Sequence, residues 1–94
     1  MAQPRNVDWQ QQCAAVIPCF NEAAGIARLV NHVRAHLPTV IVVDDGSTDA
    51  TGAQALASGA GVVRLSRNQG KGAALRTGFE FARAKGFSWA LTLD

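Results

Sequence analysis

Acidic side chains stand where predicted strands end, an arrangement suited to cation-assisted phosphate chemistry. Asp44 and Asp45 close one apolar run, and Asp94 closes another. Adjacent carboxylates repel each other unless a hydrogen-bond donor or a cation lies near them. A carboxylate at the tip of a buried strand also needs such a partner, because burial removes it from water. A nucleotide diphosphate is itself anionic. Carboxylates and phosphates therefore share one site only through a metal such as Mg²⁺ or Mn²⁺.

Asp44 and Asp45 cannot both play the same part, because neighbouring residues on a strand point to opposite faces. We expect one to accept hydrogen bonds from backbone amides and the other to face a crevice. Simpler explanations exist for each acid taken alone. The pair is also typical of a turn before a helix, and Asp94 alone could simply be solvated.

Residues 68–72 (NQGKG) form a glycine-rich loop that could offer backbone amides and the Lys71 ammonium to phosphates. The loop is not a Walker motif, because no Ser or Thr follows Lys71. It is not a Rossmann fingerprint either, since it follows the third predicted strand. Turn-forming glycines explain the loop equally well from the local sequence.

Periodicity predicts the elements that must position these groups. Short apolar runs predict strands at 13–17, 40–43, 62–65 and 89–93, with Pro18 ending the first. Helical patterns lie between them, with Asn21 capping the first helix and Leu75, Phe79 and Ala82 facing inward from the third. The order β-α-β-α-β-α-β predicts a doubly wound α/β fold with a mainly parallel sheet. Such sheets bind ligands at the carboxyl ends of their strands, where the acids and the glycine-rich loop fall.

Length and composition limit the other possibilities. With 94 residues the chain forms one domain, divided here into a polar tail at 1–12 and a partial domain at 13–94. The net charge of +2 is spread over single Lys and Arg residues, which gives no patch for nucleic acid. Cys13 and Cys19 bracket one predicted strand and stand about 20 Å apart, so we expect free thiols and a cytoplasmic protein.

Taken together, four ordered motifs resemble the GT-A-fold glycosyltransferases of family 2, especially those that make dolichyl- or polyprenyl-phosphate mannose and glucose. The similar segments are residues 16–22 (VIPCFNE), 42–51 (VVDDGSTDAT), 68–78 (NQGKGAALRTG) and 91–94 (LTLD). The last looks like the strand that leads into the Asp-x-Asp metal motif of that family. The chain then resembles the N-terminal half of a GT-A nucleotide-sugar-binding domain, truncated at that motif.

The resemblance implies a role for each matching position. Pro18, Phe20 and Glu22 would line the base and ribose. Val43 and Asp45 would contact the base, Lys71 would lie near the donor pocket, and Asp94 would bind Mg²⁺ or Mn²⁺. Asp44 and Asp49 would order the loop. It also implies transfer of a hexose, with inversion, from a UDP- or GDP-linked sugar to a polyprenyl phosphate or glycan, in a parent enzyme at the cytoplasmic face of a membrane. No catalytic residue can be named, and we do not expect the 94-residue chain to turn over.

Three other interpretations stay open. A nucleotidyltransferase also uses a doubly wound sheet, a metal and a glycine-rich loop, although its loop usually follows the first strand. A receiver-like signalling domain binds Mg²⁺ through an acidic pair, but there the pair follows strand one. A non-catalytic fragment could self-associate into a homo-oligomer through its fourth strand.

Overall fold

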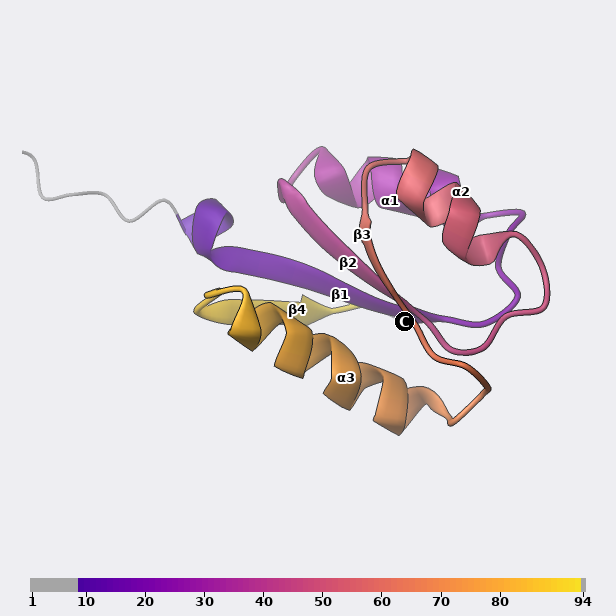
Figure 1. Cartoon of the computed structure of the whole chain (residues 1–94). Helices are drawn as coiled ribbons and strands as arrows, with labels where there is room; N and C mark the ends of the chain where they lie inside the picture. The colour runs from indigo at the N-terminus through magenta and orange to yellow at the C-terminus, as the bar shows by residue number, and fades with distance from the viewer. Residues whose placement is uncertain (1–8, 94) are drawn as a thin grey trace, which may run out of the picture.

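The computed structural model describes residues 9–93, and these residues form a parallel sheet with helices on both faces (Figure 1). After a 3-10 helix at Trp9–Gln12, strands and helices alternate along the chain. The strands are β1 (Cys13–Cys19), β2 (Thr39–Asp44), β3 (Gly61–Arg64) and β4 (Trp89–Thr92). The helices are α1 (Ile26–Arg34), α2 (Thr51–Ala57) and α3 (Lys71–Ala84). The predicted doubly wound α/β fold is thus confirmed.

The strands lie in the order β3-β2-β1-β4, and every neighbouring pair is parallel. The chain moves outward from β1 to β3 and then returns through α3 to place β4 on the other side of β1. The strand order therefore reverses between β1 and β4, and the carboxyl ends of these strands are where such a sheet binds ligands.

Two layers of apolar side chains cover the central strands. On one face, α1 and α2 pack against alternate residues of β1 and β2, including Ile17 and Val42. On the other face, α3 covers the intervening residues, including Val16 and Val43. β1 and β2 are therefore buried on both sides, as their unbroken apolar sequences predict.

Pro18 lies inside β1, so the prediction that it ends the strand is wrong. The Val16 carbonyl accepts a hydrogen bond from the Leu93 amide, whereas the Cys19 carbonyl accepts one from the Asp45 amide. Residues along a strand alternate in the neighbour they face, so Pro18 faces the β4 side, where the ladder between β1 and β4 has already ended. The amide hydrogen that proline lacks is not needed there.

Asn21 does not cap a helix, because α1 begins only at Ile26. Its backbone has φ 53°, a left-handed conformation that Asn tolerates better than most residues. The segment before α1 is instead a loop whose backbone amides are hydrogen-bonded to side chains of the segment that follows β2, as described below.

Helix α3 faces the sheet with small residues. Ala74, Gly78 and Ala82 are buried, whereas Phe79, predicted to face inward, is 39% exposed. A Cβ atom built on Gly78 would lie 2.3 Å from Cγ1 of Val16. The helix therefore approaches the sheet too closely for a large side chain on its central line, and the phenylalanine is displaced to the flank.

Candidate functional site

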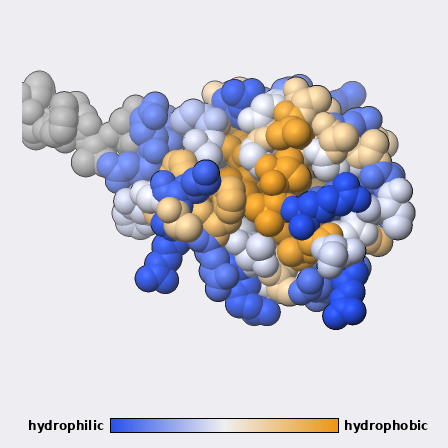
Figure 2. Space-filling view, in the orientation of Figure 1, coloured by the Kyte–Doolittle hydropathy of each residue, from blue (hydrophilic) through white to orange (hydrophobic). Residues whose placement is uncertain are grey.

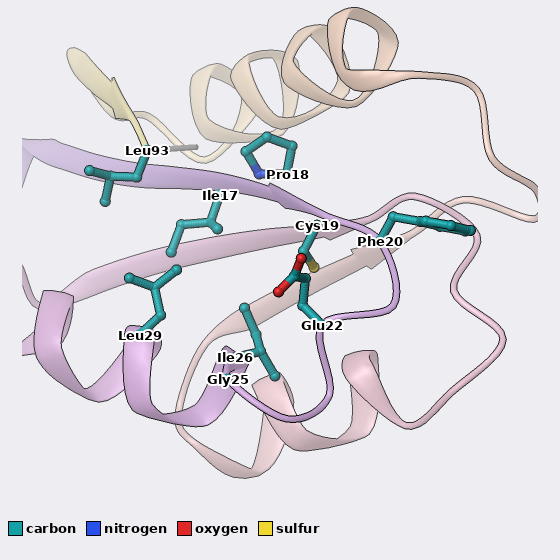
Figure 3. Close-up of a pocket in the computed structure, with 9 residues that line it drawn as sticks. All are labelled: Ile17, Pro18, Cys19, Phe20, Glu22, Gly25, Ile26, Leu29 and Leu93. Atoms are coloured by element: carbon teal, nitrogen blue, oxygen red, sulfur yellow. The ribbon is translucent and has the colours of Figure 1, made fainter.

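The end of β1 separates two adjoining hollows at the carboxyl edge of the sheet. The first hollow, of about 350 Å³, lies towards α1 (Figure 3), and its lining comprises Ile17, Pro18, Cys19, Phe20, Glu22, Gly25, Ile26, Leu29 and Leu93. The second hollow has a similar volume of about 350 Å³, and its lining comprises Pro18, Cys19, Phe20, Asp45, Asn68, Gly70 and Lys71. Pro18, Cys19 and Phe20 belong to both and form the ridge between them.

An exposed aromatic side chain stands on this ridge. Phe20 is 43% exposed although it directly follows a buried strand. Figure 3 shows its ring extending away from the sheet, while the Glu22 side chain lies between it and Ile26. In Figure 2 apolar side chains gather in the middle of the visible face, where Figure 1 has β4 ending. The edge thus combines an apolar platform with carboxylates, the mixture typical of a small-molecule site.

Asp45 joins the second hollow to the glycine-rich loop. Its Oδ1 accepts a hydrogen bond from the Gln69 amide at 2.7 Å, and its Oδ2 accepts one from the Gly70 amide at 3.0 Å. The Asn68 side-chain amide also donates to the Asp45 carbonyl at 3.3 Å. This carboxylate therefore fixes the loop that leads into Lys71, the first residue of α3.

Gly46 allows that loop to come so close. Its φ is +75°, and a Cβ atom there would lie 2.4 Å from the carbonyl carbon of Arg67 and 2.4 Å from the amide nitrogen of Asn68. Both are backbone atoms that no side-chain rotation can move aside. A glycine is required both for the left-handed conformation and for the contact.

Asp44 points to the opposite side of the strand, as the alternation predicts. It is fully buried, and its Oδ1 accepts a hydrogen bond from the Ser47 amide at 2.9 Å. Its Oδ2 has no hydrogen-bond partner and lies 3.9 Å from Nε of the exposed Arg64. Arg64 also donates to the Ser47 carbonyl at 3.1 Å. Asp44 therefore orders the turn after β2 from within the core, as the resemblance implies.

The structure brings most of the predicted site residues to these hollows. Pro18, Phe20 and Glu22 line the first, and Asp45 and Lys71 line the second. Val43 lies elsewhere: its side chain is fully buried with Val16 and Ala74 beneath α3. Its carbonyl accepts a weak hydrogen bond from the Cys19 thiol, with Sγ and O 3.7 Å apart. Val43 thus supports the ridge from beneath.

The predicted metal ligand, Asp94, lies outside the described residues. Within residues 9–93, no group of three or more His, Cys, Asp or Glu side chains could hold a metal ion. Mg²⁺, however, is commonly bound by one or two carboxylates together with substrate phosphates and water. Glu22 and Leu93, the residue after β4, both line the first hollow, so one carboxylate of the described residues lies near the carboxyl end of β4.

Sequence reasoning missed the hydrogen bonds between the segments after β1 and β2. Asn21 donates its amide to Ser47 Oγ at 2.8 Å, and its Oδ1 accepts from the Thr48 amide at 2.9 Å. The signal was present in the sequence, since an Asn in a turn and a run of Ser, Thr and Asp are groups that bond to nearby backbone. Only the parallel pairing of β1 and β2 shows that they meet.

In a receiver-like domain the first strand lies between the second and the third. Here β1 lies between β2 and β4, so the observed strand order excludes a receiver-like arrangement. Fold and site together define a parallel α/β domain whose candidate ligand edge is formed by β1, β2, the loop before α3 and β4. The profile of the family described as "Glycosyl transferase family 2" matches residues 14–94. The chain belongs to this family, in agreement with the resemblance in its motifs.

Two curated relatives make sugar-linked polyprenyl phosphates by name. The dodecaprenyl-phosphate galacturonate synthase of Rhizobium johnstonii is 38% identical over an alignment of 88 positions, gaps included, and the alignment covers 79% of this chain and 25% of the relative. The polyprenol monophosphomannose synthase of Mycolicibacterium smegmatis is 35% identical over an alignment of 99 positions, gaps included, and the alignment covers 97% of this chain and 37% of the relative. The chain thus spans about a quarter to somewhat over a third of their length.

Solved structures with this fold include glucosyl-3-phosphoglycerate synthase from Mycobacterium tuberculosis. Its complex with Mn²⁺, UDP-glucose and phosphoglyceric acid has a TM-score of 0.72 and 31% identity, covering 89% of this chain and 33% of that one. Its complex with Mg²⁺ and UDP has a TM-score of 0.70 and 30% identity over the same 89% of this chain. The likeness confirms a GT-A-type fold.

Proposed function

We propose that this chain binds a nucleotide-diphosphate sugar together with a divalent metal, as part of a glycosyltransferase. The observation that carries the proposal is the pair of hollows that meet at Phe20, with Glu22 in one and both Asp45 and Lys71 in the other. They lie where the strand order reverses. Support comes from the relatives, since the solved neighbours hold UDP or UDP-glucose with Mn²⁺ or Mg²⁺.

Each site residue has a part in this proposal. Pro18 and the exposed Phe20 ring supply apolar surface for the base, while Glu22 and Asp45 accept hydrogen bonds from base or ribose donors. Asp45 already accepts two amides, but an ionised carboxylate has room for further donors. Val43 acts by supporting the ridge. Lys71 supplies positive charge near the diphosphate.

Asp94 is proposed to hold the metal with the help of the diphosphate oxygens. When bound, Mg²⁺ or Mn²⁺ stabilises negative charge on the leaving diphosphate. The preceding strand, β4, pairs with β1 from Cys13 to Val16. Its end therefore lies at the same edge as Pro18 and Phe20.

The whole protein is proposed to transfer a hexose with inversion. An acceptor oxygen forms a bond to the anomeric carbon as the bond from that carbon to the diphosphate oxygen breaks, and the diphosphate takes the electron pair. The two curated relatives favour a polyprenyl phosphate acceptor over a glycan. We assign no general base among the 94 residues.

We propose that this transfer occurs at the cytoplasmic face of a membrane. The two free, buried thiols of Cys13 and Cys19 fit a reducing compartment, and a polyprenyl phosphate resides in a bilayer. Among residues 9–93, no helix has the length and apolar character needed to span a membrane.

Calorimetric titration tests the binding proposal. UDP and GDP are added separately to the chain, with and without Mn²⁺, and we expect heat that increases when the metal is present. No heat with either nucleotide under any of these conditions would contradict the proposal for this chain. The comparison of the two nucleotides also establishes the base preference.

The exposed edge of β4 supports a second proposal, that the chain forms homo-oligomers. β4 ends the sheet on one side, and its Trp89 and Leu91 are 64% and 49% exposed. Unpaired strand edges with apolar side chains favour pairing with another chain. Sedimentation velocity at several concentrations tests this, and a monomer at all of them would contradict it.

A further inference from the structure

Three successive backbone amides after β1 are held by side chains that follow β2. The Asn21 amide donates a hydrogen bond to Ser47 Oγ, and the Glu22 amide donates one to Thr51 Oγ1, each with a donor–acceptor distance of 2.8 Å. The next amide, that of Ala23, donates to Asp49 Oδ2 at 3.3 Å. This loop therefore takes its shape from the segment 47–51, and that segment sets the direction in which Glu22 leaves the backbone.

Thr51 lies at the centre of this arrangement. Its side chain is fully buried. Its hydroxyl donates a hydrogen bond to Asp49 Oδ1 and accepts one from the Glu22 amide. Because the hydroxyl proton is committed to Asp49, the oxygen lone pairs are turned towards Glu22. Asp49 Oδ1 also accepts the Thr51 amide at 2.9 Å, which fixes the carboxylate at the start of α2.

We infer that Thr51, oriented by Asp49, is a positioning residue for the nucleotide site and acts through the backbone amide of Glu22. This inference rests on the proposed nucleotide binding. Neither Thr51 nor Asp49 lines either hollow, so neither contacts the nucleotide. What they determine is where the Glu22 carboxylate stands relative to Phe20 across the first hollow.

The side-chain chemistry makes the inference specific. Valine has the shape of threonine without the hydroxyl, so Thr51→Val leaves the Glu22 amide without its acceptor. Serine keeps the hydroxyl, so Thr51→Ser retains the hydrogen bond. Asp49→Asn replaces one acceptor oxygen with an amide nitrogen. Asp49 is exposed, so this change is less disruptive to the fold than a change at the buried Thr51. Thr77→Val, on α3 and away from both hollows, is the matched control.

The experiment measures two quantities on the 94-residue chain. Amide hydrogen exchange by NMR reports the protection of Glu22 and Ala23 in the absence of nucleotide, and calorimetry reports the Kd for UDP or GDP with Mn²⁺. In Thr51→Val we expect exchange at Glu22 to become at least tenfold faster and the Kd to rise about fivefold to tenfold, the size expected for one lost hydrogen bond. Asp49→Asn should shift both in the same direction, while Thr51→Ser and Thr77→Val should stay near wild type.

The two readouts separate the inference from the proposed function. Absence of nucleotide heat in the wild-type chain would overturn the proposed function, whatever the exchange rates. If wild type binds but Thr51→Val and Asp49→Asn keep its Kd, or if Glu22 keeps its protection in both, the positioning inference is overturned. Recovery of both quantities in Thr51→Ser supports positioning by the hydroxyl over a general loss of packing.

Discussion

The Asp45 carboxylate accepts a hydrogen bond of 3.0 Å from the amide of Gly70, the residue immediately before α3. An acid at the end of one strand thus fixes the glycine-rich loop that follows the next strand along the chain. The same carboxylate lines the second hollow. Under the proposed function, nucleotide binding and the order of the loop are coupled through this one side chain.

Asp45→Asn should weaken this coupling. The amide group can accept at only one of its two positions, so either Gln69 or Gly70 loses its acceptor. We expect the free energy of unfolding to fall by about 1–3 kcal/mol, together with faster amide exchange at 69 and 70. Urea unfolding and NMR exchange measure the two effects. Glu80→Gln, on the exposed face of α3, is the control, and equal losses in both variants would show that the loop contact is unimportant.

Gly46→Ala should be among the most damaging single substitutions in the site. A Cβ atom would meet two backbone atoms of 67–68 at 2.4 Å, and the residue has φ +75°. We expect a loss of about 2 kcal/mol or more in the free energy of unfolding. Gly72→Ala is the matched control, because no atom beyond its chain neighbours and its own helix backbone lies within 4 Å of its Cβ position. Gly72 is the second residue of α3, and there we expect a gain of up to about 1 kcal/mol. Similar changes in both would contradict the steric argument.

The sequence predicted the order of the elements and the edge at which the site lies, because alternating β-branched runs and helical stripes leave few topologies open. Val40 to Val43 could hardly be anything except a buried strand. The same reasoning placed Asp45 and the glycine-rich loop at one edge of the sheet, since the carboxyl ends of parallel strands share one edge.

The local geometry of the loops could not be predicted in this way. That Asn21 adopts φ 53° and bonds to Ser47 and Thr48 depends on two segments that are 26 or 27 residues apart in sequence. The inward face of α3 was also misjudged, because hydrophobicity favoured Phe79 where closeness to the sheet selects Gly78. Periodicity reports polarity, whereas the distance between layers is set by side-chain volume.

Gly78→Ala tests that closeness. The added methyl group would lie 2.3 Å from Cγ1 of Val16 and 3.0 Å from Cγ2 of Val43, so α3 or β1 must shift. Overpacking of this kind costs about 1–3 kcal/mol, partly offset by the higher helix propensity of alanine. Val16→Ala makes room for the methyl group. In a double-mutant cycle we expect the pair to be more stable than the sum of the single changes predicts, and strict additivity would argue against the contact.

Cys19 should make the chain less stable as the pH rises through the alkaline range. Burial, followed by the negative charges of Asp44, Glu22, Asp49 and Asp45, raises the pKa of this thiol from 9.0 to about 12. Between these values the folded chain keeps a proton that the unfolded chain releases, so the free energy of unfolding falls as the pH rises. The slope from this group is at most about 1.4 kcal/mol per pH unit. It is about half its maximum at the unfolded pKa of 9.0 and vanishes roughly one pH unit lower, where both states keep the proton.

Cys19→Ala isolates this contribution, because Cys13 and the other alkaline groups are present in both chains. Urea unfolding at intervals from pH 8 to about pH 10.5 should give a wild-type curve that falls more steeply than that of the variant. Alkylation offers a second check: at pH 8 the buried thiol should react far more slowly than in the urea-unfolded chain, since the thiolate is the reactive form. Parallel stability curves together with rapid alkylation of the folded chain would show that Cys19 titrates normally at the ridge between the two hollows.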